Sequence, residues 1–298
     1  MQRRVFLAGG IALAATPAMS ASLEVAGGSI NIDLRGDPPP GFAMLAENWV
    51  RKSAAAVALY YGRFPVPELA VRLIVGQDGG VHGGQTFPGD VPAIRIRVGG
   101  RSDPADLLVK DWVMVHEMVH LAFPWLDLQH NWMAEGLAVY VESIARVQAG
   151  HIRPQQAWGD FVKMMPRGLP HDGDGGFEAT LSHGRTYWGG AMFCLLADIR
   201  IRQYTDNRLG LQQALRGINA VRDFRRQWDF EETLAIGDRA TGTHALRDQY
   251  MEMKDQPVTP DLDALWHGLG VMVRDGGIAF DQNARLAAVR EAIETPVS

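Results

Sequence analysis

The 298-residue chain has one cysteine, Cys194, so no disulfide can form within it. Cys194 lies in the apolar stretch 191–196, which favours a buried filler over a catalytic thiol. The chain has no run of basic residues and a formal net charge of −5, which argues against nucleic-acid binding. Beyond the N-terminal segment, no apolar stretch is long enough for a transmembrane helix. These absences point to a globular protein that acts through a few polar side chains.

Residues 1–21 have the features of an export signal. Arg3 and Arg4 form a basic region, residues 5–15 are apolar and small, and residues 17–21 offer a cleavage site. The run R-R-V-F-L resembles the twin-arginine signal, and an ordinary secretory signal with two arginines is the alternative. Both predict a periplasmic or secreted bacterial protein with no stable membrane insertion after the signal is removed.

The remaining chain divides into two predicted parts, an α/β subdomain over 22–103 and a mostly helical subdomain over 104–298. Alternation and glycine content set the elements of the first part. These are a hairpin or short strand in 23–34, a helix over 42–61, strands over 69–75 and 93–98, and a loop over 76–84. The predicted fold class is therefore α+β, with a small mixed sheet and helices followed by a mostly helical subdomain.

In the second part, helical spacing of apolar residues and helix-breaking residues predict the elements. Its first helix is expected to be capped by Ser102 or Asp103, with Pro104 in the first turn, and to end at Pro124. The later elements are expected to be helices over 131–149 and 187–204, a structured loop over 166–186, two helices in 207–256 and one near 285–293.

Within the first of these helices stands His116-Glu117-Met118-Val119-His120, flanked by apolar residues. Positions i and i+4 share a helix face, so His116 and His120 can direct one ring nitrogen each at a single ion. Glu117 is one step around the helix, where its carboxylate can reach a water on that ion. The pattern is the H-E-x-x-H zinc motif with a general base. The alternative is a buried helix that carries two histidines, but an unpartnered carboxylate is rare in such a place.

A catalytic zinc needs a third protein ligand and one open position. Phe123 and Leu126 stand where an H-E-x-x-H-x-x-G-x-x-H pattern needs glycine and histidine, so Glu135 on the following helix is the better candidate. Glu142 shares its face, and can either orient a histidine or be a solvated carboxylate.

The second helix reads W-M-A-E-G-L-A-V-Y over 132–140, and Y-W-G-G-A follows at 187–191. Together with H-E-x-x-H, these segments resemble the gluzincin zinc metallopeptidases, in particular the glycyl aminopeptidase and aminopeptidase N-type catalytic domains, over about residues 110–250. The resemblance implies a thermolysin-like zincin catalytic domain with one Zn²⁺ that hydrolyses a peptide or protein substrate. It implies that His116, His120 and Glu135 bind the zinc. It also implies that Glu117 is the general base and that Tyr187 donates a hydrogen bond to the oxyanion.

The sequence departs from that family at several points. Gly189 replaces the lysine of Y-x-K-G-A, and the G-x-M-E-N segment that reads a free amine is missing. Residues 84–87 could be an edge strand that binds the substrate backbone, or a plain turn before a strand. The departures leave two other hypotheses open: a catalytically retired zincin-like domain that acts as a periplasmic binding module, and an enzyme of non-peptide amides or epoxides.

Overall fold

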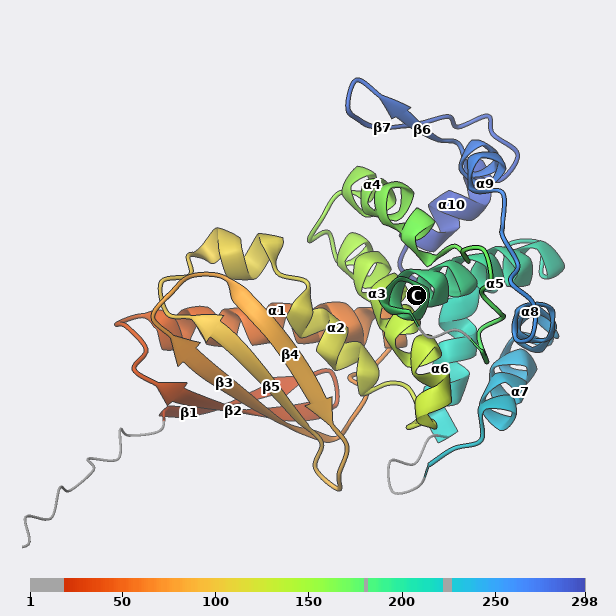
Figure 1. Cartoon of the computed structure of the whole chain (residues 1–298). Helices are drawn as coiled ribbons and strands as arrows, with labels where there is room; N and C mark the ends of the chain where they lie inside the picture. Colours follow the sequence, from red (N-terminus) through yellow and green to blue (C-terminus); the bar gives the residue numbers. More distant parts are fainter. Residues whose placement is uncertain (1–18, 180–181, 222–226, 298) are drawn as a thin grey trace, which may run out of the picture.

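Alternating apolar residues form a five-stranded mixed sheet in the computed structural model, which describes residues 19–179, 182–221 and 227–297 (Figure 1). The strand order is β1-β2-β3-β5-β4; β2, β3 and β5 run parallel, and β1 and β4 are antiparallel to their neighbours. The strands are β1 Met19–Val25, β2 Gly28–Gly36, β3 Glu68–Gly76, β4 Val81–Phe87 and β5 Ala93–Gly99. Most of the predicted export signal, residues 1–18, lies outside the described residues.

The predicted loop over 76–84 is partly wrong, because the edge strand β4 already begins at Val81. Gly83 has φ 126°, and the register shifts between Val81 and Gly83, so a bulge interrupts the pairing with β5 without ending it. Glycine permits this backbone conformation, and the same glycines made the segment look like a loop. The structure thus favours the strand over the turn at residues 84–87.

Helix α1, Phe42–Tyr61, confirms the predicted helix and packs its apolar face on the sheet. Its buried residues Trp49 and Val50 belong to one hydrophobic cluster with Ile94 and Ile96 of β5. The same cluster continues into the helices that follow, so the sheet and the helical part share one core. The helix that carries the His116–His120 motif is therefore packed into this shared core.

The motif helix α2, Val113–His120, is shorter than predicted. Asp111 caps it, accepting hydrogen bonds from the backbone N–H groups of Val113 and Met114. Asp103 instead begins a separate π-helical turn, η1 (Asp106–Lys110), and the Ser102 hydroxyl bonds the carbonyl of Gly99. The predicted caps were therefore wrong, because the chain makes an extra turn before the motif.

The helical part surrounds α3 and α5 (Figure 1). Its elements are η2 Leu128–His130, α3 Asn131–Gln148, α4 Pro154–Met164, η3 Met165–Gly168, η4 Arg185–Gly189, α5 Gly190–Tyr204, α6 Leu211–Val221, α7 Phe230–Thr241, α8 Ala245–Met253, α9 Leu262–Leu269, β6 Val271–Arg274, β7 Gly277–Phe280 and α10 Ala287–Glu294. The predicted helices over 131–149, 187–204 and 285–293 are confirmed.

Residues 207–256 contain three described helices where two were predicted. Gly242, with φ 66°, ends α7, and α8 starts three residues later, so a short turn separates these two helices. Helix α9 and the β6–β7 hairpin were not predicted. None of the described helices has both the length and the apolar character needed to cross a membrane.

Candidate metal centre

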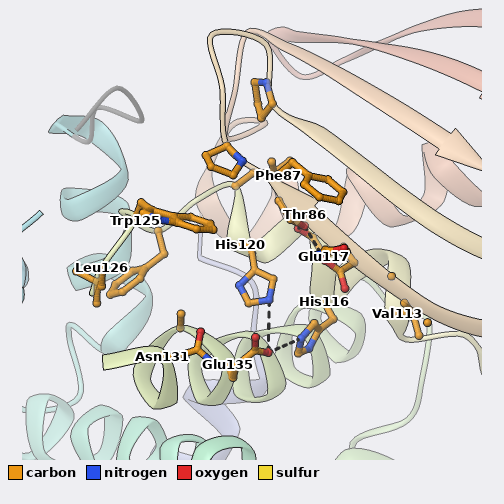
Figure 2. A pocket seen from close by; sticks show the side chains of 18 of the residues that line it. Thr86, Phe87, Val113, His116, Glu117, His120, Trp125, Leu126, Asn131 and Glu135 are labelled. Atoms are coloured by element: carbon orange, nitrogen blue, oxygen red, sulfur yellow. Dashed lines mark hydrogen bonds and ion pairs between the residues drawn. The ribbon is translucent and has the colours of Figure 1, made fainter. Parts of the chain in front are cut away.

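Two neighbouring helices bring three potential ligands together. His116 and His120 lie one turn apart on α2, and Glu135 faces them from α3 (Figure 2). Glu135 Oε2 is 3.2 Å from His116 Nε2 and 3.6 Å from His120 Nε2. The ligand atoms of the three residues all lie within 4.8 Å of one another. The structure thus places the two predicted histidines and the predicted glutamate in one cluster.

These distances fit a tetrahedral metal site. Zinc lies about 2.0–2.2 Å from nitrogen and oxygen ligands, which places the ligand atoms of a tetrahedral site about 3.3–3.6 Å apart. The two histidine–glutamate separations are close to this spacing. The His116 ring is buried, and its Nδ1 has no hydrogen-bond partner among the described residues. All polar contacts of that ring are therefore on its Nε2 side, toward Glu135.

The charges in the cluster support metal binding. Burial opposes ionisation of Glu135, but hydrogen bonds with His116 and His120 outweigh it and hold the Glu135 pKa well below its usual range. Burial lowers the pKa of His116, which favours the neutral ring that binds metal. For His120, the contacts with Glu135 overcome burial and raise the pKa, so a metal that binds this ring would displace its proton. An anionic carboxylate between two imidazoles is a donor set suited to zinc.

Glu117 is buried beside the cluster and is held by the edge strand. The hydroxyl of Thr86 on β4 lies 2.6 Å from Glu117 Oε2 and 2.9 Å from the Glu117 carbonyl oxygen. Gly84, two residues earlier on the same strand, is so close that a Cβ atom there would lie 2.5 Å from Glu117 Cγ. The edge strand can therefore approach the carboxylate only because residue 84 lacks a side chain. Sequence reasoning identified Glu117 but missed its contact with Thr86.

Tyr187 reaches the same cavity from η4, the π-helical turn that leads into α5. Gly136 of α3 and Gly190 of α5 touch, since a Cβ on Gly136 would lie 2.2 Å from Gly190 Cα. This close contact explains the glycines at 136 and 190 of the sequence motifs, because it brings η4 against the helix that carries Glu135. Burial and the nearby carboxylates of Glu135 and Glu117 raise the pKa of Tyr187, so its phenol remains a hydrogen-bond donor.

The centre opens into a cavity of about 610 Å³. Its walls are the whole of β4, one face of α2, the start of α3 and the 123–128 loop. Tyr187 also lines it. Figure 2 shows Val113 to one side of the ligands and Trp125 with Leu126 to the other. The cavity thus runs along β4 beside His116, His120 and Glu135.

Two further sequence hypotheses are resolved. Glu142 neither contacts a ligand histidine nor is solvated: it is 7% exposed, and it bonds Ser143 at 2.9 Å and Arg146 at 3.3 Å. Burial raises the pKa of Glu142 to about 7 despite the Arg146 guanidinium. Cys194 is fully buried on α5 and burial raises its pKa, as expected for a core filler.

The fold resembles those of solved M1 zinc metallopeptidases. An aminopeptidase N family protein from Idiomarina loihiensis matches 86% of this chain and 50% of its own, with a TM-score of 0.58 and 14% identity. The M1 zinc metallopeptidase from Deinococcus radiodurans matches 82% of this chain and 53% of its own, with a TM-score of 0.56 and 15% identity. A mutant of the Deinococcus enzyme bound to a Tyr-Ser-Ala substrate matches with a TM-score of 0.55 and 13% identity, over the same shares of the two chains.

No known family profile matches the sequence, and no curated protein matches it. The chain spans about half the length of the solved structures that it resembles. At such low identity the similarity shows the fold: the α+β fold of a zinc metallopeptidase catalytic domain, predicted from the sequence motifs, is confirmed.

Proposed function

We propose that this protein is an exported zinc-dependent metallopeptidase that hydrolyses peptide bonds. The observation that carries the proposal is the convergence of His116, His120 and Glu135 within 4.8 Å, beside a buried glutamate and an open cavity. The fold is that of proteins named as zinc metallopeptidases, one of which was solved with a peptide substrate. Three protein ligands leave a position open, whereas a structural zinc site is closed by four.

His116 and His120 would hold one Zn²⁺ through their Nε2 atoms, and Glu135 through Oε2. When bound, the ion would lower the pKa of a water toward neutrality and polarise the peptide carbonyl. His116 is buried and His120 and Glu135 are partly buried, which limits competition from bulk water and restricts the directions of the three side chains.

Glu117 is proposed to handle the proton. Its carboxylate accepts the proton of the attacking water and later donates it to the nitrogen of the leaving amine. The contact with Thr86 fixes the carboxylate on the cavity side of α2. Because the carboxylate is already held in place, no reorientation is needed before the reaction.

Tyr187 is proposed to stabilise the negative charge that develops on the carbonyl oxygen. Its phenol faces the same cavity as Glu117, and its raised pKa keeps the proton on the oxygen at neutral pH. A neutral donor aimed at a developing oxyanion contributes most in a site that excludes water.

Residues 1–21 are proposed to export the protein by the twin-arginine route to the periplasm or beyond, as the R-R-V-F-L run suggests. This route carries folded proteins, so it suits an enzyme that binds its metal before export. The retired-enzyme hypothesis is less favoured, because the ligands, the base and the phenol all face one cavity.

Metal analysis and a peptide-cleavage assay test the function. We expect one zinc per chain, cleavage of unstructured peptides, loss of cleavage with a chelator and recovery when zinc is restored. A protein that binds zinc but cleaves no peptide in a diverse library would contradict the proposal and favour a binding module.

A further inference from the structure

We infer that the cavity binds the interior of an extended peptide with bulky apolar side chains, so that the enzyme cleaves within a chain and not at its end. This inference rests on the proposed peptidase function and adds the class of substrate. Three features of the cavity support it: an edge strand along its full length, apolar walls at both ends, and the lack of an available partner for a terminal charge among the described lining residues.

The edge strand provides a place for a peptide backbone. Strand β4 is last in the sheet order, so one side of its backbone is not paired within the sheet. Every residue of β4 lines the cavity, and Gly84 and Thr86, which contact Glu117, lie in the middle and second half of the strand. A peptide that adds to this edge therefore extends beyond the cleaved bond in both directions.

Apolar side chains line the cavity on both sides of the ligands. Trp112 is 47% exposed, and its ring lies 5.5 Å from the His116 ring at the start of α2. Trp125 is also 47% exposed and Leu128 is 84% exposed, both after the end of α2. Exposed large apolar residues are unremarkable singly, but a group that lines one cavity indicates an apolar ligand.

The ends of a peptide are charged, and the described lining residues include few groups that could pair with those charges. They include no lysine or arginine, and the His82 ring is 3.1 Å from Asp78. Glu135 faces the two ligand histidines and Glu117 contacts Thr86, so both carboxylates are already engaged.

The third carboxylate among the described lining residues is Asp127. It is exposed at the rim, where it accepts a hydrogen bond from Gln227. Solvent weakens the attraction of such a carboxylate for an ammonium group. A charged terminus would therefore lose water without gaining a strong partner, whereas an interior segment brings no charge into the cavity.

Three synthetic peptides test this inference with the zinc-loaded protein. The first has free termini and an apolar centre, the second is the same peptide acetylated and amidated, and the third is blocked with a serine- and glycine-rich centre. We expect internal cleavage of the first two, with kcat/KM values within about threefold of each other, and at least about tenfold lower kcat/KM for the third. Release of single terminal residues from the first peptide, with the second left intact, would overturn the inference while the peptidase function stands.

A binding measurement distinguishes failure of the peptidase function from failure of the inferred substrate class. The Glu117→Gln variant should bind the blocked apolar peptide as tightly as the free one, measured by a change in tryptophan fluorescence. Binding without cleavage by the parent protein would overturn the peptidase function but support the peptide site. Binding of the free peptide alone would overturn the inference.

Substitutions at two cavity positions, Trp125 and Asp127, locate the contacts with the peptide. Trp125→Ala should raise KM for the blocked apolar peptide at least about fivefold, and Trp125→Phe should restore most of that loss. Val273→Ala, at an exposed position on β6 outside the cavity, is the control. Asp127→Asn should leave the ratio of kcat/KM for the free and blocked peptides unchanged, and a selective loss for the free peptide would show that Asp127 binds an amine.

Discussion

Among the described residues, two glutamates, Glu135 and Glu178, each contact histidine in very different settings. At the metal centre, His116 Nε2 lies 3.2 Å from Glu135 Oε2. Immediately before α3, His130 Nε2 lies 3.1 Å from Glu178 Oε1. Both histidines are buried, at 5% and 9% exposure, so neither pair is an ordinary surface contact.

What surrounds each pair differs. At the first, His120 adds a second imidazole and the cavity adds open space. At the second, the Tyr250 hydroxyl bonds Glu178, and the Phe230 ring covers His130 with centroids 4.4 Å apart. Among the described residues, only the first site gathers three ligands. The comparison teaches that the same pair of side chains is suited to metal binding where further donors and space converge, and to packing where aromatic rings close the site.

The largest effect is expected from removing a ligand. His120→Ala should lose zinc and with it all measurable peptide cleavage, because a catalytic zinc held by two ligands binds far more weakly. Metal analysis of the purified variant measures the loss. A variant that retained a full zinc equivalent would show that His120 is not a ligand.

The next largest effect is expected from changing Glu117, the proposed general base. Glu117→Gln should retain zinc but lower kcat by about 10²–10⁴-fold, because the amide cannot accept the proton of the attacking water. Glu178→Gln is the matched change at the second site and should leave kcat within about threefold of the parent. Equal losses in the two variants would remove the distinction between the sites.

The two phenols provide a third test. Tyr187→Phe should lower kcat by about 10²–10³-fold, the usual cost of removing one oxyanion donor, with little change in KM. Tyr250→Phe removes the hydroxyl that bonds Glu178 and should affect stability instead of turnover. Parental turnover in Tyr187→Phe would contradict the proposed role of that phenol.

A smaller effect is expected from the edge strand. Thr86→Val keeps the shape of the side chain but removes its hydrogen bond to Glu117, and should lower kcat about tenfold with zinc content unchanged. Thr86→Ser, which keeps the hydroxyl, should recover most of the activity. If the serine and valine variants lose activity equally, packing rather than the hydrogen bond explains the effect.

The smallest effect on activity is expected at the second site. His130→Gln should lower the free energy of unfolding by about 1–3 kcal/mol, because it leaves the buried polar cluster imperfectly bonded. Zinc content and kcat should stay at parental values. Denaturant unfolding and metal analysis measure both, and a loss of zinc would show that the two sites are coupled.

Much of the fold was predictable because its signals are local. The spacing of apolar residues predicted α1 at its exact bounds and α3 to within one residue. The cap of α2 was not predictable in this way, since an extra π-helical turn moved the start of the helix from residue 104 to Val113. The start of strand β4 was not predicted, because its glycines indicate a loop. The pairing with β5 that makes the segment a strand is not visible in the local sequence.

The sequence by itself determined the candidate ligand set, because the spacing of His116 and His120 on one helix face is a local property and Glu135 follows in a recognisable motif. Only the tertiary structure decided that Thr86 holds Glu117, that glycines at 136 and 190 bring Tyr187 to the site, and that His130 meets Glu178 in a closed cluster. These contacts join residues that are 31 to 54 positions apart, or on separate elements. Their formation depends on how helices and sheet pack around a shared core, and no local pattern encodes that packing.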